Sequence, residues 1–179
     1  MSKIGRKPIN IGNIQVEIKG NEIHYKGKKN SGIYVLPEEL TATVEDKSLK
    51  IVANKDIADI NRIWGLHRAL ISNKLKGSDN PFEKQLKIVG LGFKGALSGN
   101  KIQFSLGYSH KIDFELPKDV VVEIDKTGQL LTVKCSDKEV LGHVCSSIRS
   151  LRPPEPYKGT GIQYMNEVII RKAGKTKSA

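Results

Sequence analysis

The chain has 179 residues, a length that suits one domain of ordinary size or two small ones. No apolar run approaches the ~18 residues needed to span a membrane, and residues 1–8 are basic but lack the apolar core of a secretory signal. Cys135 and Cys145 are too few for a disulfide scaffold, and their spacing matches no common zinc pattern. We therefore expect a soluble, intracellular, folded protein.

The net charge of +11 is concentrated at the two ends of the chain. Residues 1–29 and residues 141–179 each hold seven basic and two acidic side chains, whereas the residues between them hold 16 basic and 15 acidic ones. Cations concentrated in this way favour a polyanionic partner, because each Lys or Arg placed against a phosphate releases condensed counterions. Two alternatives stay open. In the first, the basic ends serve only to keep the protein soluble. In the second, they bind an anionic membrane, which has less support because neither end has an amphipathic basic helix.

The first half of the chain predicts several strands followed by one helix. From residue 60 the apolar residues recur at helical spacing, and the sequence KLKG at residues 74–77 is typical of a helix end. Residues 77–81 then form a short linker. Strands are predicted at residues 14–18, 22–26, 33–35, 41–45 and 49–52.

The second half repeats this order at a nearly constant offset. The sequence GNKIQF at residues 99–104 matches GNEIHY at residues 20–25, 79 positions earlier. The Leu-Pro pair at residues 116–117 follows the one at residues 36–37 by 80 positions. The alternative is chance similarity between two α+β domains. We interpret the repeat as a duplicated unit of roughly 80 residues, a size at which two copies are expected to share an interface.

A second predicted helix completes the repeat. Ser136 and Glu139 have the spacing of a capping box, and the helix is expected to end at Arg152 because two prolines follow it. The predicted fold class is α+β: two similar domains from an internal duplication, each a mostly antiparallel sheet packed on one helix. The domains are expected at residues 1–81 and 82–179.

The segment GLGFKG at residues 90–95 has the form of a dinucleotide-binding motif. In that motif a helix must begin at the third glycine, so that its amide groups face the pyrophosphate. Here another turn and a predicted strand follow instead. We therefore interpret these glycines as sites of bulges, tight turns or close backbone approach, and the competing function is a small-molecule enzyme that uses this motif.

No constellation of catalytic or metal-ligating residues is evident. The four histidines are scattered, and Cys145 falls on the apolar face of the second predicted helix, where it is expected to pack in the core. We expect no catalysis, no cofactor, no metal and no small-molecule substrate.

Residues 149–164 form the most informative segment. Three prolines within residues 153–156 are expected to fix it as an extended loop before any partner arrives, which lowers the entropy lost on binding. Gly159 and Gly161 leave room for a phosphate to approach the backbone, and Tyr157 is placed to stack on a base or sugar. A surface loop that only stops the helix is the alternative. The basic tail that follows, RKAGKTK at residues 171–177, favours nucleic acid.

The sequence PEPYKGTGI at residues 154–162 resembles the signature of ribosomal protein L6 of the bacterial-type large subunit. The opening MSKIGRKP, the segment LGYSH at residues 106–110, residues 149–154 and the tail RKAGK are similar to the same family, so the resemblance covers essentially the whole chain. One departure is Thr160, where the family usually has a lysine.

The resemblance implies two similar α+β domains and a structural protein of the cytoplasmic ribosome. It further implies binding to large-subunit ribosomal RNA near the sarcin–ricin region, support of the site where translational GTPases dock, and contact with neighbouring ribosomal proteins; no membrane is involved. An RNA-binding protein outside the ribosome is a third class. The residues expected to contact RNA are Lys3, Arg6, Lys7, Arg149, Arg152, Pro154, Pro156, Tyr157, Lys158, Gly159, Thr160, Gly161, Arg171, Lys172, Lys175 and Lys177.

Overall fold

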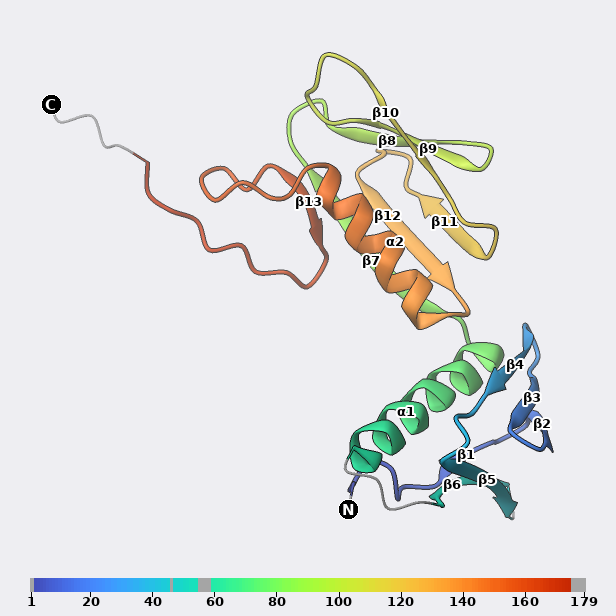
Figure 1. Ribbon diagram of the computed structural model, residues 1–179. Coiled ribbons are helices and arrows are strands. Elements are labelled where there is room, and N and C mark those ends of the chain that lie inside the picture. The colour runs from blue at the N-terminus through green and yellow to red at the C-terminus, as the bar shows by residue number, and fades with distance from the viewer. Residues whose placement is uncertain (1, 46, 55–58, 175–179) are drawn as a thin grey trace, which may run out of the picture. The chain divides into compact units, whose positions relative to one another are not determined.

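The computed structural model describes residues 2–45, 47–54 and 59–174 of the chain, which divide into two compact units (Figure 1). The first unit is Met1–Pro81 with Ser136–Lys138, and the second is Phe82–Cys135 with Glu139–Ala179. Each unit holds one helix and two antiparallel sheets, so the predicted α+β class is confirmed. The strands of each unit divide between two sheets, a detail that the alternation of apolar residues does not specify.

In the first unit, helix α1 lies along two three-stranded antiparallel sheets (Figure 1). One sheet has the order β1-β6-β5 and the other the order β2-β3-β4. Ile23, Leu49 and Leu75, from three different elements, are almost wholly buried in its core. The elements are β1 (Ile9–Asn10), β2 (Gln15–Lys19), β3 (Glu22–Lys26), β4 (Ser31–Val35), β5 (Leu40–Glu45), β6 (Ser48–Ala53) and α1 (Ile60–Asp79).

In the second unit, one sheet has four strands in the order β11-β12-β7-β13, and the other has three in the order β10-β9-β8. Strand β13 lies at the edge of the larger sheet, antiparallel to β7. The elements are β7 (Phe82–Val89), β8 (Lys94–Ser98), β9 (Lys101–Ser105), β10 (Ile112–Glu115), β11 (Val120–Ile124), β12 (Leu130–Cys135), α2 (Lys138–Leu151) and β13 (Gly161–Tyr164).

The two units have the same architecture, element by element. The order β5-β6-β1 in the first unit corresponds to β11-β12-β7 in the second, and the hairpins β2-β3-β4 correspond to β8-β9-β10. Even single hydrogen bonds recur: the Leu36 amide donates to the Asn21 carbonyl at 2.8 Å, and the Leu116 amide donates to the Asn100 carbonyl at 3.0 Å. The predicted internal duplication is therefore confirmed. Among the described residues, β13 has no counterpart in the first unit.

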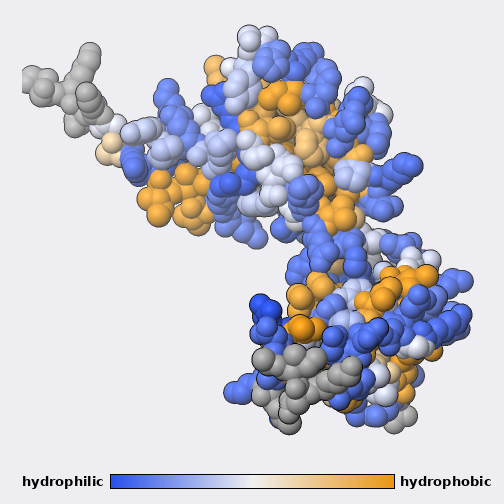
Figure 2. All heavy atoms as spheres, viewed as in Figure 1, coloured by the Kyte–Doolittle hydropathy of each residue, from blue (hydrophilic) through white to orange (hydrophobic). Residues whose placement is uncertain are grey.

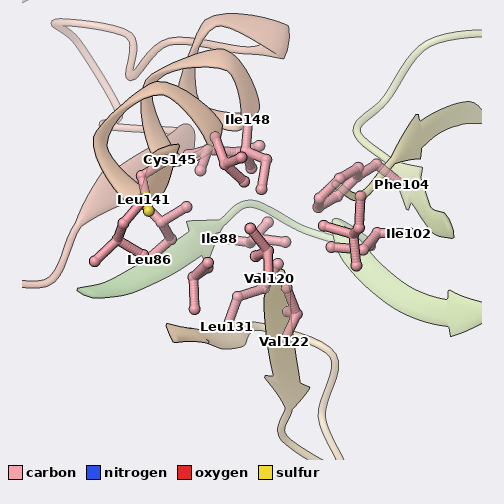
Figure 3. Packing of buried hydrophobic residues seen from close by; sticks show 14 of the residues in the cluster. Leu86, Ile88, Ile102, Phe104, Val120, Val122, Leu131, Leu141, Cys145 and Ile148 are labelled. Carbon is pink, nitrogen blue, oxygen red and sulfur yellow. The ribbon is translucent and has the colours of Figure 1, made fainter. Parts of the chain in front are cut away.

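The core of the second unit forms where α2 packs against the sheets (Figure 3). Leu141, Cys145 and Ile148 project from one face of α2 toward Leu86 and its neighbours on the strands, and all four are at most 1% exposed. Cys145 is a core residue, as its place on the apolar face predicted. Its burial raises the pKa of the thiol, so the group stays protonated and inert.

Both helices depart slightly from their predicted ends. Helix α1 continues through Gly77 to Asp79, because the Ser78 hydroxyl donates to the Leu75 carbonyl at 2.7 Å and the buried Ser78 packs against Gly27. Tertiary packing thus outweighs the local stop signal. Helix α2 begins at Lys138, two residues after Ser136 of the predicted capping box, and it ends at Leu151, one residue before Arg152.

The glycine motif at residues 90–95 joins β7 to β8, and no helix follows it. Because β8 begins at Lys94, the motif lacks the helix N-terminus that would face a dinucleotide pyrophosphate. Gly90 of the motif, together with Gly107 outside it, instead makes room for the ring of Phe93. A Cβ on Gly90 would lie 2.5 Å from Phe93 Cδ2, and a Cβ on Gly107 would lie 2.7 Å from Phe93 Cε1. Close packing on an aromatic ring explains Gly90, and a left-handed backbone with φ of 73° explains Gly92.

Candidate nucleic-acid interface

The proline-rich segment forms a compact loop between α2 and β13. The Glu155 amide donates to the Thr160 carbonyl at 2.9 Å, and the Gly159 amide donates back to the Glu155 carbonyl at 3.0 Å. The prolines fix φ on one side of this turn, and the two hydrogen bonds close the other. The loop is therefore a closed turn rather than the extended loop that its prolines predicted, because these two backbone hydrogen bonds bring residues 155 and 160 together.

Gly161 is required by the backbone of the loop itself. Its φ is 139°, and a Cβ at this position would lie 2.6 Å from the Pro153 carbonyl oxygen. The neighbouring Ile162 amide donates to the Arg152 carbonyl at 2.8 Å, which holds the start of β13 against the segment that follows α2. The close approach at Gly161 is thus made by the protein's own backbone.

The tail returns to the loop after β13 and adds its charges there. The Lys172 amide donates to the Pro156 carbonyl at 2.8 Å. The Arg171 guanidinium lies against Gly159, where an added Cβ would be 3.2 Å from Arg171 Nη2. Lys158, Arg171 and Lys172 are exposed, and we call these three residues the basic turn. None of them forms an ion pair within the part of the chain that the structure describes.

Tyr157 and Thr160 occupy different settings on this loop. Tyr157 is 54% exposed next to Lys158, where its ring is open to a partner. The Thr160 hydroxyl donates to Glu155, with 3.0 Å between Oγ1 and Oε2. The residue that replaces the family's lysine therefore holds the loop's own carboxylate in place.

Arg149, predicted as a phosphate contact, already has a partner inside the protein. Its Nε and Nη2 donate to Glu167 Oε2 and Oε1 at 3.0 and 2.5 Å. Glu167 also accepts a hydrogen bond from the Tyr164 amide at 3.1 Å. The hydrogen bond from Arg149 lowers the pKa of Glu167 and raises that of Arg149 further. This forked pair ties the end of α2 to the start of the tail.

Arg152, three residues further along, has a different environment. Its guanidinium carbon lies 4.8 Å from the ring centroid of Tyr108 and 5.3 Å from that of Phe93. Among the described residues no carboxylate lies within ion-pair distance of it. No role is predicted for Phe93 from the sequence, and Tyr108 enters only as part of a family-like segment. The glycines beside the Phe93 ring are the signal that could have identified this contact.

The remaining predicted contacts fall in two places. Lys3, Arg6 and Lys7 are exposed on the first unit, where Arg68 binds the Lys7 carbonyl oxygen at 3.1 Å. Lys175 and Lys177 lie outside the described residues. Pro154 and Pro156 belong to the loop described above.

The described residues contain no group of three His, Cys, Asp or Glu side chains that could hold a metal ion. His67 is structural: its Nδ1 lies 2.7 Å from the Tyr34 hydroxyl, and burial lowers the pKa of the imidazole, which favours its neutral form. No helix among these residues is apolar over enough of its length to cross a membrane.

The outer surface also exposes apolar groups along the tail. Figure 2 shows hydrophilic residues over much of the visible face of each unit, with patches of hydrophobic residues among them. Val168 and Ile170 are 88% and 85% exposed. Large aliphatic side chains left this open are a common mark of a contact surface when they adjoin one another.

Comparison with known proteins places these features in a family. The family model described as Ribosomal protein L6 matches residues 89–165. A large ribosomal subunit protein uL6 from Bifidobacterium animalis is 43% identical over 175 residues, covering 97% of each chain. The corresponding protein from Magnetococcus marinus is 39% identical and covers 99% of this chain and 100% of its own length. That from Syntrophomonas wolfei is 42% identical over 98% of each chain.

These relatives extend over nearly the full length of the chain and share about two residues in five with it. The matches cover both copies of the duplicated unit, the proline–glycine loop and the beginning of the tail. The chain therefore belongs to the uL6 family of large ribosomal subunit proteins.

Proposed function

We propose that this chain binds large-subunit ribosomal RNA through the basic turn, near the sarcin–ricin region, and supports the site where translational GTPases dock. The single observation that carries the proposal is the convergence of Lys158, Arg171 and Lys172 from a loop and a distant tail onto one turn. Such a cluster of unpaired cations raises the local concentration of a polyanion and releases its counterions.

Family membership supports the setting. The chain is a protein of the large subunit and is located in the ribosome of the cytoplasm; its relatives are structural ribosomal proteins, not enzymes. Ribosomal RNA is largely A-form, with base edges hidden in a deep, narrow groove. The contacts are therefore to phosphates, sugars and shape, with Tyr157 as a stacking or packing anchor.

The two halves have different parts in this proposal. Residues 82–179 form the C-terminal repeat and carry the basic loop and tail, including Lys175 and Lys177, while residues 1–81 form the N-terminal repeat. Lys3, Arg6 and Lys7 provide a second, smaller set of phosphate contacts. The exposed Val168 and Ile170 offer an apolar surface to a neighbouring ribosomal protein.

The test replaces the basic turn by K158Q, R171Q and K172Q together and measures the affinity of the full chain for a large-subunit ribosomal RNA fragment. Each lost phosphate contact is expected to lower the slope of log affinity against log salt by about 0.9. The matched control is K87Q, K118Q and K126Q, three exposed lysines of the same unit. Equal behaviour of the two triple variants would reject the basic turn as the RNA site.

Two further measurements test the finer claims. Sedimentation of a cell extract through sucrose is expected to place the chain with the large subunit; recovery only in RNA-bound particles of other sizes would favour an RNA-binding protein outside the ribosome. Chemical probing of assembled subunits is expected to show protection of the sarcin–ricin region. Protection confined to other regions would contradict the proposed location.

A further inference from the structure

Two arginines at the end of α2 have opposite environments. The charge of Arg149 is matched by both carboxylate oxygens of Glu167. Arg152 has only aromatic faces against its guanidinium, and no carboxylate of the described residues lies within ion-pair distance of it. An aromatic face attracts a cation without neutralising its charge. Arg152 is therefore oriented but electrostatically unmatched, whereas Arg149 is both oriented and matched.

The platform under Arg152 is itself held in place. The Phe93 ring is confined by Gly90 and Gly107, whose positions leave no room for a Cβ. The Tyr108 hydroxyl donates to the carbonyl of Leu151 at 3.1 Å, one of the last carbonyls of α2. Both rings are thus fixed by the residues beside Arg152 or by the backbone around them.

The hydrogen-bonding groups of the Arg152 guanidinium are available to a partner, because among the described residues they donate to no protein acceptor. The N–H groups of a guanidinium lie in its plane and form a fork of donors. The Arg152 carbonyl also accepts the Ile162 amide at 2.8 Å, so its backbone is fixed by β13. Fixing a long side chain before binding removes part of the entropy cost of ordering it in a complex.

We propose that Phe93 and Tyr108 hold Arg152 as a preformed receptor for an RNA phosphate, which makes residues 90–93 and 106–110 part of the RNA-binding surface. This inference rests on the proposed function and extends it to two loops outside the basic turn. Phe93 and Tyr108 are positioning residues that act through Arg152. The forked guanidinium matches two phosphate oxygens, which a lysine ammonium does not.

The experiment is a double-mutant cycle on the full chain, with a large-subunit ribosomal RNA fragment as the probe. R152Q is expected to weaken binding about tenfold. It is also expected to make the slope of log affinity against log salt less negative by about 0.9, the value for one phosphate. Y108L is expected to weaken binding about two- to fivefold, because the stacking energy of an exposed cation–π pair has that size. Y108F keeps the ring but loses the hydrogen bond to the Leu151 carbonyl, so it is expected to weaken binding less than Y108L does.

The diagnostic result is the combination R152Q with Y108L. If the ring acts only by positioning Arg152, adding Y108L to R152Q changes the affinity no further. An additional loss in that background would mean that Tyr108 contacts RNA by itself and would overturn the positioning role. R152K, which keeps the charge but loses the planar fork, supplies the same test if Y108L does not fold; it is expected to weaken binding about two- to fivefold, and unchanged binding would count against the proposal.

The outcomes separate this inference from the proposed function. If the basic-turn triple variant loses affinity while R152Q binds with the original affinity and slope, the receptor is wrong and the proposed function stands. If the unmodified chain shows no salt-dependent binding to the RNA fragment, the proposed function fails and the receptor fails with it.

Discussion

Gly161 marks the closest backbone approach in the proline–glycine loop, and its effect on stability is testable. We expect G161A to lower the free energy of unfolding by about 2 kcal/mol or more, because a Cβ would meet the Pro153 carbonyl oxygen at 2.6 Å and φ is 139°. The control is G142A in α2, where a Cβ meets nothing within 4 Å. That substitution should stabilise the protein by about 0.5–1 kcal/mol through helix propensity. Urea denaturation measures both, and equal effects would contradict the argument.

The sequence predicts whether a side chain is buried more reliably than it predicts which residues that side chain contacts. The placement of Cys145 in the core follows from its position on an apolar helical face, and the structure confirms it. Arg149 and Arg152 look equivalent in sequence, since both are basic residues beside the same prolines. Their difference depends on Glu167 and on the rings of Phe93 and Tyr108, which only the folded chain brings near. The spacing of residues along the sequence does not predict such contacts.

At the scale of elements, the Arg149–Glu167 pair joins α2 to the tail and gives a pH-dependent stability. The hydrogen bond from Arg149 lowers the folded-state pKa of Glu167 below its usual value of 4.5. The pair therefore contributes stability that is fully present above pH ~4.5, and this contribution is lost as the pH falls through the lower, folded-state pKa.

We expect E167Q to be less stable than the unmodified chain at pH 7, with a difference that shrinks as the pH falls below that window. Thermal unfolding from pH 7 to pH 3 measures the effect. Glu155 provides the matched control: E155Q alters a carboxylate whose partner is the neutral Thr160 hydroxyl, so no comparable loss of an ion pair accompanies it. A difference between E167Q and the unmodified chain that is constant with pH would contradict this account.

The elements themselves were largely predictable because their signals are local. Strands and helices appear where apolar residues alternate or recur at helical spacing. The extension of α1 to Asp79 was not predictable, since it depends on Ser78 packing against Gly27, far away in sequence. Strand β13 was also missed, because only pairing with β7 gives its four residues a strand conformation.

At the scale of the whole molecule, the uneven charge predicts strongly salt-dependent RNA binding. The four contacts proposed for the basic turn and Arg152 would by themselves contribute about −3.6 to the slope, by analogy with duplex DNA. Doubling the salt concentration from 0.1 M should therefore weaken binding by about tenfold or more. Filter binding or fluorescence anisotropy across salt concentrations measures the slope, and an affinity independent of salt would refute the assignment of these charges.

The duplication was visible in the sequence because turn residues and buried strands recur at nearly the same spacing. The assignment of the RNA site to the second copy came from composition and the family-like signature, and it stays a proposal. The sequence could not show that the tail folds back to Pro156, because one backbone hydrogen bond from Lys172 makes that contact.

Strand β13 pairs with the edge strand β7 of an arrangement of sheets that both units share, and the described first unit forms that arrangement without such a strand. The loop before this strand and the tail after it are attached there, outside the frame common to both copies. Changes in the loop can therefore alter recognition while the shared frame keeps its own packing. Among the described residues, the first unit holds the shared arrangement of strands and helix alone, and the second unit holds the same arrangement with one further strand and its flanking loop and tail.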